Sequence, residues 1–271
     1  MRAPAAAKIN LALVVGTTRA DGKHEVLTVL QRVGLVDRIE LEPASRLTVN
    51  GFTQDTLVRG ALEALAARAG TDPAWRVTIE KQIPVAGGLG GGSSDAATAL
   101  KLANATLPEP LPPEELRALA APLGADVPFF LTDGPQLGSG DGSELAPLDL
   151  PQDYWIVLVQ PHGATKPSTA AVYAAFDARD GDSGFDERAG ALRDTLALVL
   201  RPRDLAALPP NDLATSPLAD ELRAHGAFRA DVSGAGPVVY GLFHHQAHAK
   251  AARKALRRLG QAWLTAPAWY G

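Results

Sequence analysis

The sequence of 271 residues contains no cysteine. This absence excludes disulfide bonds, thiolate metal sites and a catalytic thiol, and it is typical of a reducing compartment. Long apolar runs are also absent, because none reaches the ~18 residues that a membrane-spanning helix needs. Lys8 and Asn10 interrupt the apolar part of "MRAPAAAKINLALVV", which a signal peptide would not tolerate. We therefore expect a cytoplasmic protein with no membrane partner.

An excess of positive charge is missing as well. Lysine and arginine total 26 against 30 aspartate and glutamate residues, so the formal net charge is −4. This balance gives no indication of a nucleic-acid partner, and an anionic ligand would need a local arrangement of donors. Hydrophobic residues at 46% and charged residues at 21% are usual for a globular protein. The length allows one large domain or two moderate ones.

Strand patterns recur through the first half of the chain. Alternation in "KINLALVV" predicts a strand that places Lys8 and Asn10 on one face, roughly 6.6–7 Å apart. Short strands are predicted within 27–43, and "WRVTIEKQIPV" alternates again over 75–85.

Two helices are predicted between and after these strands. The first covers 55–70, with Asp55 at its N-cap and Gly70 at its end. The second, "SSDAATALKLANATL", is predicted to be capped by Ser93 or Ser94. A glycine-rich segment thus joins a strand to a helix N-terminus.

The second half begins after a predicted domain boundary near residue 150. It opens with the strand-like "YWIVLVQP" and continues with several helical patterns. It then contains a strand–turn–strand pattern in "DVSGAGPVVYGLF", a helix in "HQAHAKAARKALRRLG" and a last strand in "QAWLTAP". Because strands are partly adjacent and partly separated by helices, we expect an α+β fold.

The segment "VAGGLGGGSSDAA" at 85–97 is typical of an anion site. Backbone N–H groups without side chains in the way can point at a ligand, and a helix dipole adds partial positive charge. A flexible linker is the alternative, but the run is short and lies between a strand and an amphipathic helix.

Two common phosphate-binding motifs do not fit this segment. The dinucleotide pattern G-x-G-x-x-G fails, because its last position falls on Ser93 or Asp95. The P-loop pattern fits from Gly87 to Gly92, but Ser93 stands where a lysine is required. A cation must therefore come from a metal ion or from a lysine elsewhere.

Three motifs in order, "AAKINLAL", "PVAGGLGGGSSDAA" and "VSGAGPVVYGLF", resemble those of the GHMP kinase superfamily. The additional segments "RADGKHEV", "LGADVPFFL" and "NDL" resemble the branch of that superfamily formed by the 4-diphosphocytidyl-2-C-methyl-D-erythritol kinases. The similarity extends over essentially the whole chain, and the central motif is highly specific.

This resemblance implies an α+β, two-domain GHMP kinase fold. The N-terminal domain, 1–150, would be an ATP-binding α/β domain with a left-handed βαβ-type core. The C-terminal domain, 151–271, would be ferredoxin-like. ATP and a cytidine-bearing substrate would bind between them, and the γ-phosphoryl group would pass to the 2-hydroxyl of the methylerythritol moiety. Mg²⁺ would assist, although its ligands are unknown from the sequence.

The resemblance assigns catalytic roles to Lys8 and Asp126. Asp126 falls at the family's catalytic aspartate and would accept the proton of the substrate hydroxyl; taken alone, "GAD" before Val-Pro is more typical of a helix N-cap or turn. Lys8 falls at the family's catalytic lysine and would stabilise the transferring phosphoryl group. The expected ATP-binding residues are Pro84, Val85, Ala86, Gly87, Gly88, Leu89, Gly90, Gly91, Gly92, Ser93 and Ser94.

Substrate binding is assigned in the same way to Asn10, His24 and Lys23. Asn10 would hydrogen-bond the substrate, and His24 would contact the cytosine edge. Lys23 stands where the family commonly has an aromatic residue that stacks on cytosine, so only its aliphatic stem could cover the base. Two further departures are Thr56 in place of asparagine and Ala235 in place of serine or threonine.

Two alternatives to this substrate remain open. Another GHMP kinase, acting on a mevalonate-type or homoserine-type alcohol, would share the motifs. A non-catalytic nucleotide-binding protein would have no use for both Lys8 and Asp126. The oligomeric state is not predicted.

Overall fold

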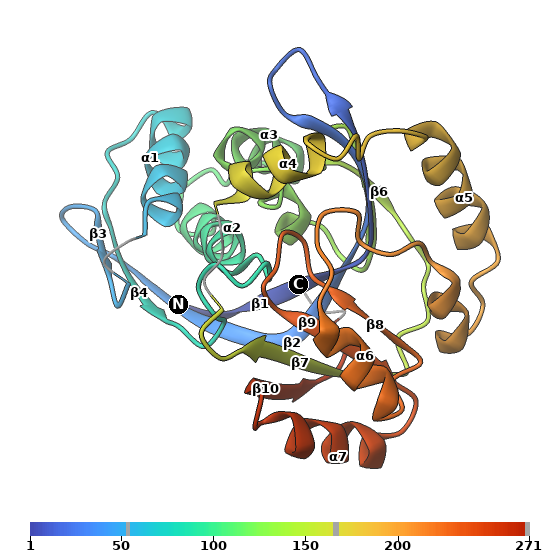
Figure 1. The fold of residues 1–271 in the computed structure, drawn as a ribbon. Helices are drawn as coiled ribbons and strands as arrows, with labels where there is room; N and C mark the ends of the chain where they lie inside the picture. The colour runs from blue at the N-terminus through green and yellow to red at the C-terminus, as the bar shows by residue number, and fades with distance from the viewer. Residues whose placement is uncertain (53–54, 165–167, 269–271) are drawn as a thin grey trace.

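The computed structural model describes residues 1–52, 55–164 and 168–268. Its strands form one sheet in each half of the chain, and helices pack against both (Figure 1). Within the described ranges, no helix is long and apolar enough to cross a membrane.

The first sheet has six strands in the order β3-β4-β2-β5-β6, with β1 paired to β2. The β1–β2 pair is long and antiparallel, and its hairpin reaches past the helices at the top of Figure 1. β3 and β4 are parallel, and a helix connects them in sequence, which forms a βαβ unit. The strands are β1 (Arg2–Thr18), β2 (His24–Pro43), β3 (Thr48–Asn50), β4 (Trp75–Glu80), β5 (Gln136–Ser139) and β6 (Glu144–Pro147).

Helices of the first half cluster beside this sheet (Figure 1). Their apolar residues, mainly alanine and leucine, form one buried core with β2 and β4. Small alanine side chains on α2 let this helix lie close to its neighbours, and the whole helix is nearly buried. The helices are α1 (Leu57–Ala69), α2 (Gly91–Asn104) and α3 (Pro113–Ala120), with 3₁₀ turns η1 (Ala121–Leu123) and η2 (Pro128–Leu131).

The second sheet is antiparallel, in the order β10-β7-β9-β8. Numbered within this half, the order is 4-1-3-2, which is the ferredoxin-like arrangement that the resemblance implies. Its strands are β7 (Trp155–Pro161), β8 (Arg229–Val232), β9 (Val239–Phe243) and β10 (Gly260–Thr265). Its helices are α4 (Thr169–Asp177), α5 (Phe185–Ala197), η3 (Pro202–Ala207), α6 (Pro217–Ala224) and α7 (Gln246–Leu256).

The two halves share a core. One cluster of buried residues joins apolar side chains of β1 and β2 to those of β7, β9 and α5. After β10 the chain returns to β2, where the Gly34 N–H donates to the Ala266 carbonyl and the Ala268 N–H to the Arg32 carbonyl. The second half is therefore joined to β1 and β2 both by this shared core and by backbone hydrogen bonds.

Most of the predicted elements are confirmed. The strand at 8–15 lies within β1, and α1 ends at Gly70, which adopts a left-handed conformation with φ of 65°. The N-cap of α1 is Thr56 and not Asp55 as predicted, although the Asp55 carboxylate accepts from the Val58 N–H at 3.0 Å. The domain limits at 150/151 and the left-handed βαβ core stay predictions.

Two predictions about local structure are wrong. Residues 24–43 form one strand instead of several short ones, because register shifts in its pairing with β1 absorb the irregularities. Ser93 and Ser94 do not cap α2; the helix begins after Gly90, whose φ of 68° only glycine adopts readily. Both serines lie in the first turn of the helix.

Candidate active site

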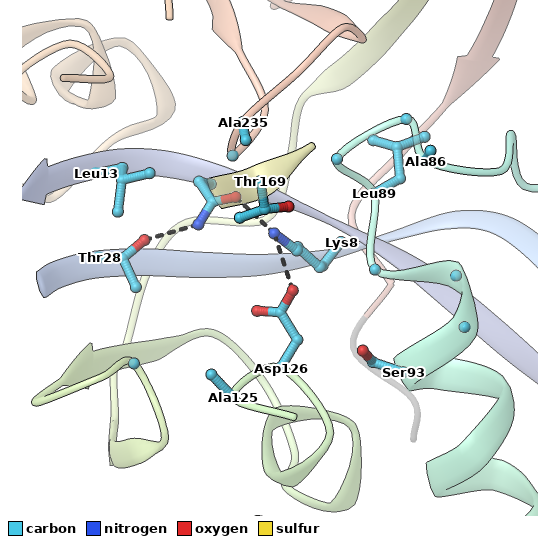
Figure 2. A pocket seen from close by; sticks show the side chains of 18 of the residues that line it. Lys8, Leu13, Thr28, Ala86, Leu89, Ser93, Ala125, Asp126, Thr169 and Ala235 are labelled. Carbon is cyan, nitrogen blue, oxygen red and sulfur yellow. Dashed lines mark hydrogen bonds and ion pairs between the residues drawn. The ribbon is translucent and has the colours of Figure 1, made fainter. Parts of the chain in front are cut away.

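A cleft of about 570 Å³ lies between the two halves of the protein (Figure 2). This volume falls within the usual range for small-molecule and cofactor sites. Its walls come from β1, β2, the glycine-rich segment, the loop before η2, α4 and the turn between β8 and β9. Of the predicted site residues, Lys8, Asn10, Asp126 and the whole run from Pro84 to Ser93 line this cleft.

Contacts within the protein constrain the conformation of the glycine-rich segment. At Gly88, with φ of 82°, an added Cβ would overlap the carbonyl oxygen of Ser233. At Gly90 the Cβ would lie 3.0 Å from both the Lys8 side chain and the Phe130 ring. The Ser233 hydroxyl donates to the Gly88 carbonyl at 2.9 Å, so the third motif packs behind the loop as predicted.

Gly88→Ala should therefore cost more than Gly92→Ala, its matched control in the same segment. At Gly92 an added Cβ meets only the end of the Leu57 side chain, at 3.4 Å. We expect Gly88→Ala to lower the free energy of unfolding by about 1–3 kcal/mol, because it adds backbone strain and a steric overlap. Urea denaturation of both variants measures this difference, and equal losses would contradict the stated role of Gly88.

Lys8 and Asp126 face each other across the cleft (Figure 2). The Lys8 ammonium lies 3.4 Å from Asp126 Oδ2 and donates to Asn10 Oδ1 at 2.7 Å. Asn10 in turn donates to the Thr28 hydroxyl, which donates to the Ala12 carbonyl, each at 2.8 Å. This chain of hydrogen bonds fixes the Asn10 amide with its oxygen toward Lys8. Asn10 thus positions the lysine, and its contact with substrate stays a prediction.

Hydrogen bonds join β1, which carries Lys8, to the glycine loop and to the turn behind it. The Lys8 N–H donates to the Leu89 carbonyl at 2.9 Å, which ties β1 to the loop. The Asn211 side chain donates to the carbonyls of Val232 and Gly234, and the Asp212 carboxylate accepts from the Val15 N–H. The "NDL" segment therefore joins β1 to the turn behind the loop.

Lys81 is a second lysine on the cleft wall, but two buried carboxylates hold it. Its ammonium lies 2.5 Å from Asp37 and 2.7 Å from Asp95. Burial and the nearby Asp37 raise the pKa of Asp95 to about 7, although Lys81 opposes this shift. Asp37 also accepts from the N–H groups of Gln82 and Ile83. This cluster anchors the start of α2 to the segment before the loop.

The raised pKa of Asp95 predicts a pH-dependent stability. The folded state holds this proton up to about pH 7, whereas the unfolded state releases it near 3.8. The stabilisation is therefore complete below about pH 4 and is lost as the pH rises through 7. Asp95→Asn removes the titration, so its unfolding free energy relative to wild type should increase by roughly 2 kcal/mol between pH 5 and pH 8. Urea denaturation at both pH values checks this, and parallel pH profiles would refute it.

His24 is not among the described residues that line the cleft, but it contacts α4, which contributes to the cleft wall. Its Nε2 lies 2.7 Å from Asp177 Oδ1, and its ring stacks on Tyr173 with centroids 4.6 Å apart. Tyr173 lines the cleft, and burial together with the Asp126 charge raises its pKa to about 12. We did not predict Tyr173, because "STAAVYAAFD" shows only a helical pattern and no motif.

The remaining predicted residues lie elsewhere. Lys23 forms an ion pair with Asp141 and is not among the described residues that line the cleft. Burial opposes ionisation of Asp141, yet Lys23 and Ser143 lower its pKa to about 2. Ser94 is buried and faces a different pocket, described below.

In the part of the chain that the structure describes, no group of three or more histidine and acidic residues could hold a metal ion by itself. The cleft offers the Asp126 carboxylate and the Ser93 hydroxyl. Mg²⁺ in phosphoryl-transfer sites is usually held by one or two protein groups together with substrate phosphates. These residues fit a Mg²⁺ ion of that kind and no self-contained metal centre.

Comparison with known proteins identifies the family. Residues 56–134 match the GHMP kinases N terminal domain, and residues 204–262 match the GHMP kinases C terminal model. A 4-diphosphocytidyl-2-C-methyl-D-erythritol kinase of Nocardia farcinica is 41% identical over 88% of this chain and 82% of its own length. The enzyme of that name from Moorella thermoacetica is 37% identical over 96% and 95% of the two chains. The chain belongs to the GHMP kinase family.

Solved structures agree with this GHMP kinase fold. A crystal structure of 4-(cytidine 5'-diphospho)-2C-methyl-D-erythritol kinase covers both chains completely, with a TM-score of 0.80 and 33% identity. The mevalonate kinase of Methanococcus jannaschii has a TM-score of 0.75 over 100% of this chain and 98% of its own. At 13% identity, that second likeness shows the fold alone.

Proposed function

We propose that this GHMP kinase transfers the γ-phosphoryl group of ATP to the 2-hydroxyl of 4-diphosphocytidyl-2-C-methyl-D-erythritol, a step of non-mevalonate isoprenoid precursor biosynthesis. The observation that carries the chemistry is the Lys8–Asp126 pair, which faces the glycine loop in one cleft. The substrate is supported by relatives of that name at 35–41% identity. The cytoplasmic location stays a prediction.

In this proposal each of the two residues has one task. Asp126 accepts the proton of the substrate hydroxyl as its oxygen attacks the γ-phosphorus and the bond to the bridging oxygen of ADP breaks. General-base catalysis of this kind contributes about 10²–10⁴-fold. Lys8 supplies the cation that the loop lacks and stabilises negative charge on the phosphoryl oxygens during transfer.

The phosphates of ATP are expected to lie along Pro84–Ser93. The first N–H groups of α2 have no partner within the helix, so they can donate to phosphate oxygens. Mg²⁺, held by those phosphates with Ser93 and Asp126, would neutralise part of their charge.

Tyr173 offers an aromatic face for the cytosine ring. Lys23 has no aromatic ring, and its ammonium is paired with Asp141. Tyr173 stacks on His24, the residue that the resemblance assigns to the cytosine edge, and it belongs to the cleft wall. We therefore assign base stacking to Tyr173.

Tyr173→Ala should weaken binding of the cytidine substrate selectively. Stacking between a base and an aromatic side chain contributes about 1–3 kcal/mol, so we expect the KM for this substrate to rise roughly 5- to 100-fold. Tyr173→Phe keeps the ring and is the matched control. Steady-state kinetics should show an unchanged KM for ATP in both variants, and an unaltered KM for the cytidine substrate in Tyr173→Ala would remove this assignment.

An assay of ADP release decides the proposed function. The protein is given ATP and Mg²⁺ with 4-diphosphocytidyl-2-C-methyl-D-erythritol, and in parallel with mevalonate or homoserine. We expect ADP only with the cytidine substrate, with the new phosphate on its 2-hydroxyl. Turnover of mevalonate or homoserine alone would assign a different alcohol, and binding of ATP without transfer to any of the three would contradict the proposed kinase activity.

A further inference from the structure

A second pocket, here called the α2 pocket, lies beside α2 and shares no lining residue with the cleft. Its volume is about 110 Å³. The start of β1, the middle of β2, α2 and η2 contribute to its wall. Its principal lining residues are Pro4, Arg32, Ser94, Thr98, Lys101 and Phe130.

Arg32 brings a buried positive charge into this pocket. The residue is 2% exposed, and its Nη2 donates to the carbonyls of Phe129 and Thr132. Its Nη1 is buried and has no hydrogen-bond partner among the described residues. An uncompensated buried charge is strongly unfavourable, so this guanidinium is short of an anionic partner.

Lys101 adds a second cation to the same wall. Burial and the charge of Arg32 both lower the pKa of Lys101, and burial lowers that of Arg32. Among the described residues, the carboxylate that acts on both cations is Asp133, which is exposed. Within the described ranges, neither cation has a carboxylate at ion-pair distance.

The other polar groups of the α2 pocket are two hydroxyls. Ser94 and Thr98 lie one helical turn apart on α2, and both are at least nine-tenths buried. Together with Arg32 and Lys101 they present two cationic and two hydroxyl donors to a small enclosed volume. That donor set matches an anion with several oxygens, because charge-assisted hydrogen bonds from arginine and lysine favour such groups.

We propose that the α2 pocket binds a small tetrahedral oxyanion of the phosphate class, as the free ion. The ion would accept from Lys101, Ser94 and Thr98 and would lie beside the Arg32 guanidinium, whose charge it would compensate. A volume near 110 Å³ is large enough for inorganic phosphate.

Occupancy of this pocket acts on the segment that carries the candidate base. Arg32 pairs with Lys8 in the β1–β2 register, and it holds the carbonyls of the turn that begins two residues after Asp126. An anion that compensates Arg32 stabilises this turn. We therefore expect phosphate to protect the folded protein.

The test measures phosphate binding while the cleft is filled. Wild type and variants are saturated with a non-hydrolysable ATP analogue, so that phosphate cannot occupy the glycine loop. Inorganic phosphate then replaces chloride at constant ionic strength, and the unfolding temperature is followed. The variant is Lys101→Gln, and Lys254→Gln on the exposed face of α7 is the matched control.

We expect phosphate and sulfate to raise the unfolding temperature of wild type and Lys254→Gln. Loss of one charge-assisted hydrogen bond in Lys101→Gln should weaken the apparent Kd for phosphate roughly 10-fold or more. Thr98→Val should weaken it also, which keeps the test valid if Lys101→Gln folds poorly in chloride.

Three results would overturn the proposal. The first is equal phosphate binding by Lys101→Gln, Thr98→Val and Lys254→Gln. The second is a response to acetate as large as that to phosphate, which would indicate a carboxylate site. The third is equally tight binding of glycerol 3-phosphate, which would indicate a phosphate ester instead of the free ion.

Discussion

Asp126→Asn should lower kcat about 10²- to 10⁴-fold, the usual contribution of a general base. The substitution keeps the size of the side chain but removes the carboxylate that lies 3.4 Å from the Lys8 ammonium. Since Asp126 is partly exposed at the cleft, the amide should fold normally. The KM values for both substrates should stay within a few-fold of wild type, because the lost interaction belongs to the transition state. Steady-state kinetics with ADP detection measures both quantities.

Asp141→Asn is the matched control for this prediction. Asp141 is a second carboxylate on the cleft wall, but it is engaged by Lys23 and Ser143. We expect this variant to retain most of the wild-type kcat. A larger loss in Asp141→Asn than in Asp126→Asn would move the role of base to Asp141.

The sequence could predict the elements whose pattern is local. The strand at Lys8 and Asn10 follows from alternation, and the end of α1 follows from Gly70. The start of α2 could not be placed, because Gly90 takes its left-handed conformation where Lys8 and Phe130 close the space around it. These two neighbours lie far from the loop in sequence.

The site residues likewise divide into those that the sequence predicted and those that depend on contacts between distant segments. The resemblance placed Lys8, Asp126 and the glycine loop, and the structure brings all three to one cleft. Tyr173 and Lys81 escaped prediction, because one sits in an ordinary helical pattern and the other in a strand-like one. Tyr173 reaches the cleft because the two halves pack together, whereas Lys81 is held there by Asp37 and Asp95, and no local pattern predicts either arrangement.

Some glycines of the motif are needed for packing within the protein and not only for ligand binding. Gly88 is required by the Ser233 carbonyl behind it, whereas a Cβ at Gly92 would contact only the end of the Leu57 side chain. The resemblance treats these glycines alike as phosphate contacts. The structure distinguishes Gly88, which the packing of the fold requires, from Gly92, where the packing would tolerate a Cβ.

Lys8→Met should lower kcat about 10²- to 10³-fold, the loss typical of removing one group that stabilises transition-state charge. Methionine keeps the apolar stem of this buried side chain but removes its ammonium. The loop has no cation in its own sequence, and Lys81 on the cleft wall is paired with Asp37 and Asp95. Steady-state kinetics gives kcat, and the unfolding temperature shows whether the protein remains folded.

Lys81→Met is the comparison that shows which lysine stabilises the transferring phosphoryl group. Lys81 also lines the cleft, but its charge is shared between Asp37 and Asp95, which are almost fully buried. Removing it leaves two buried carboxylates without their cation, so we expect Lys81→Met to lose several kcal/mol of stability, as for a broken buried pair. Lys8→Met should show the reverse, with a large loss of kcat and a smaller loss of stability. If folded Lys81→Met lost more turnover than Lys8→Met, the phosphoryl group would be stabilised by Lys81. Lys8 would then line the cleft without a catalytic role.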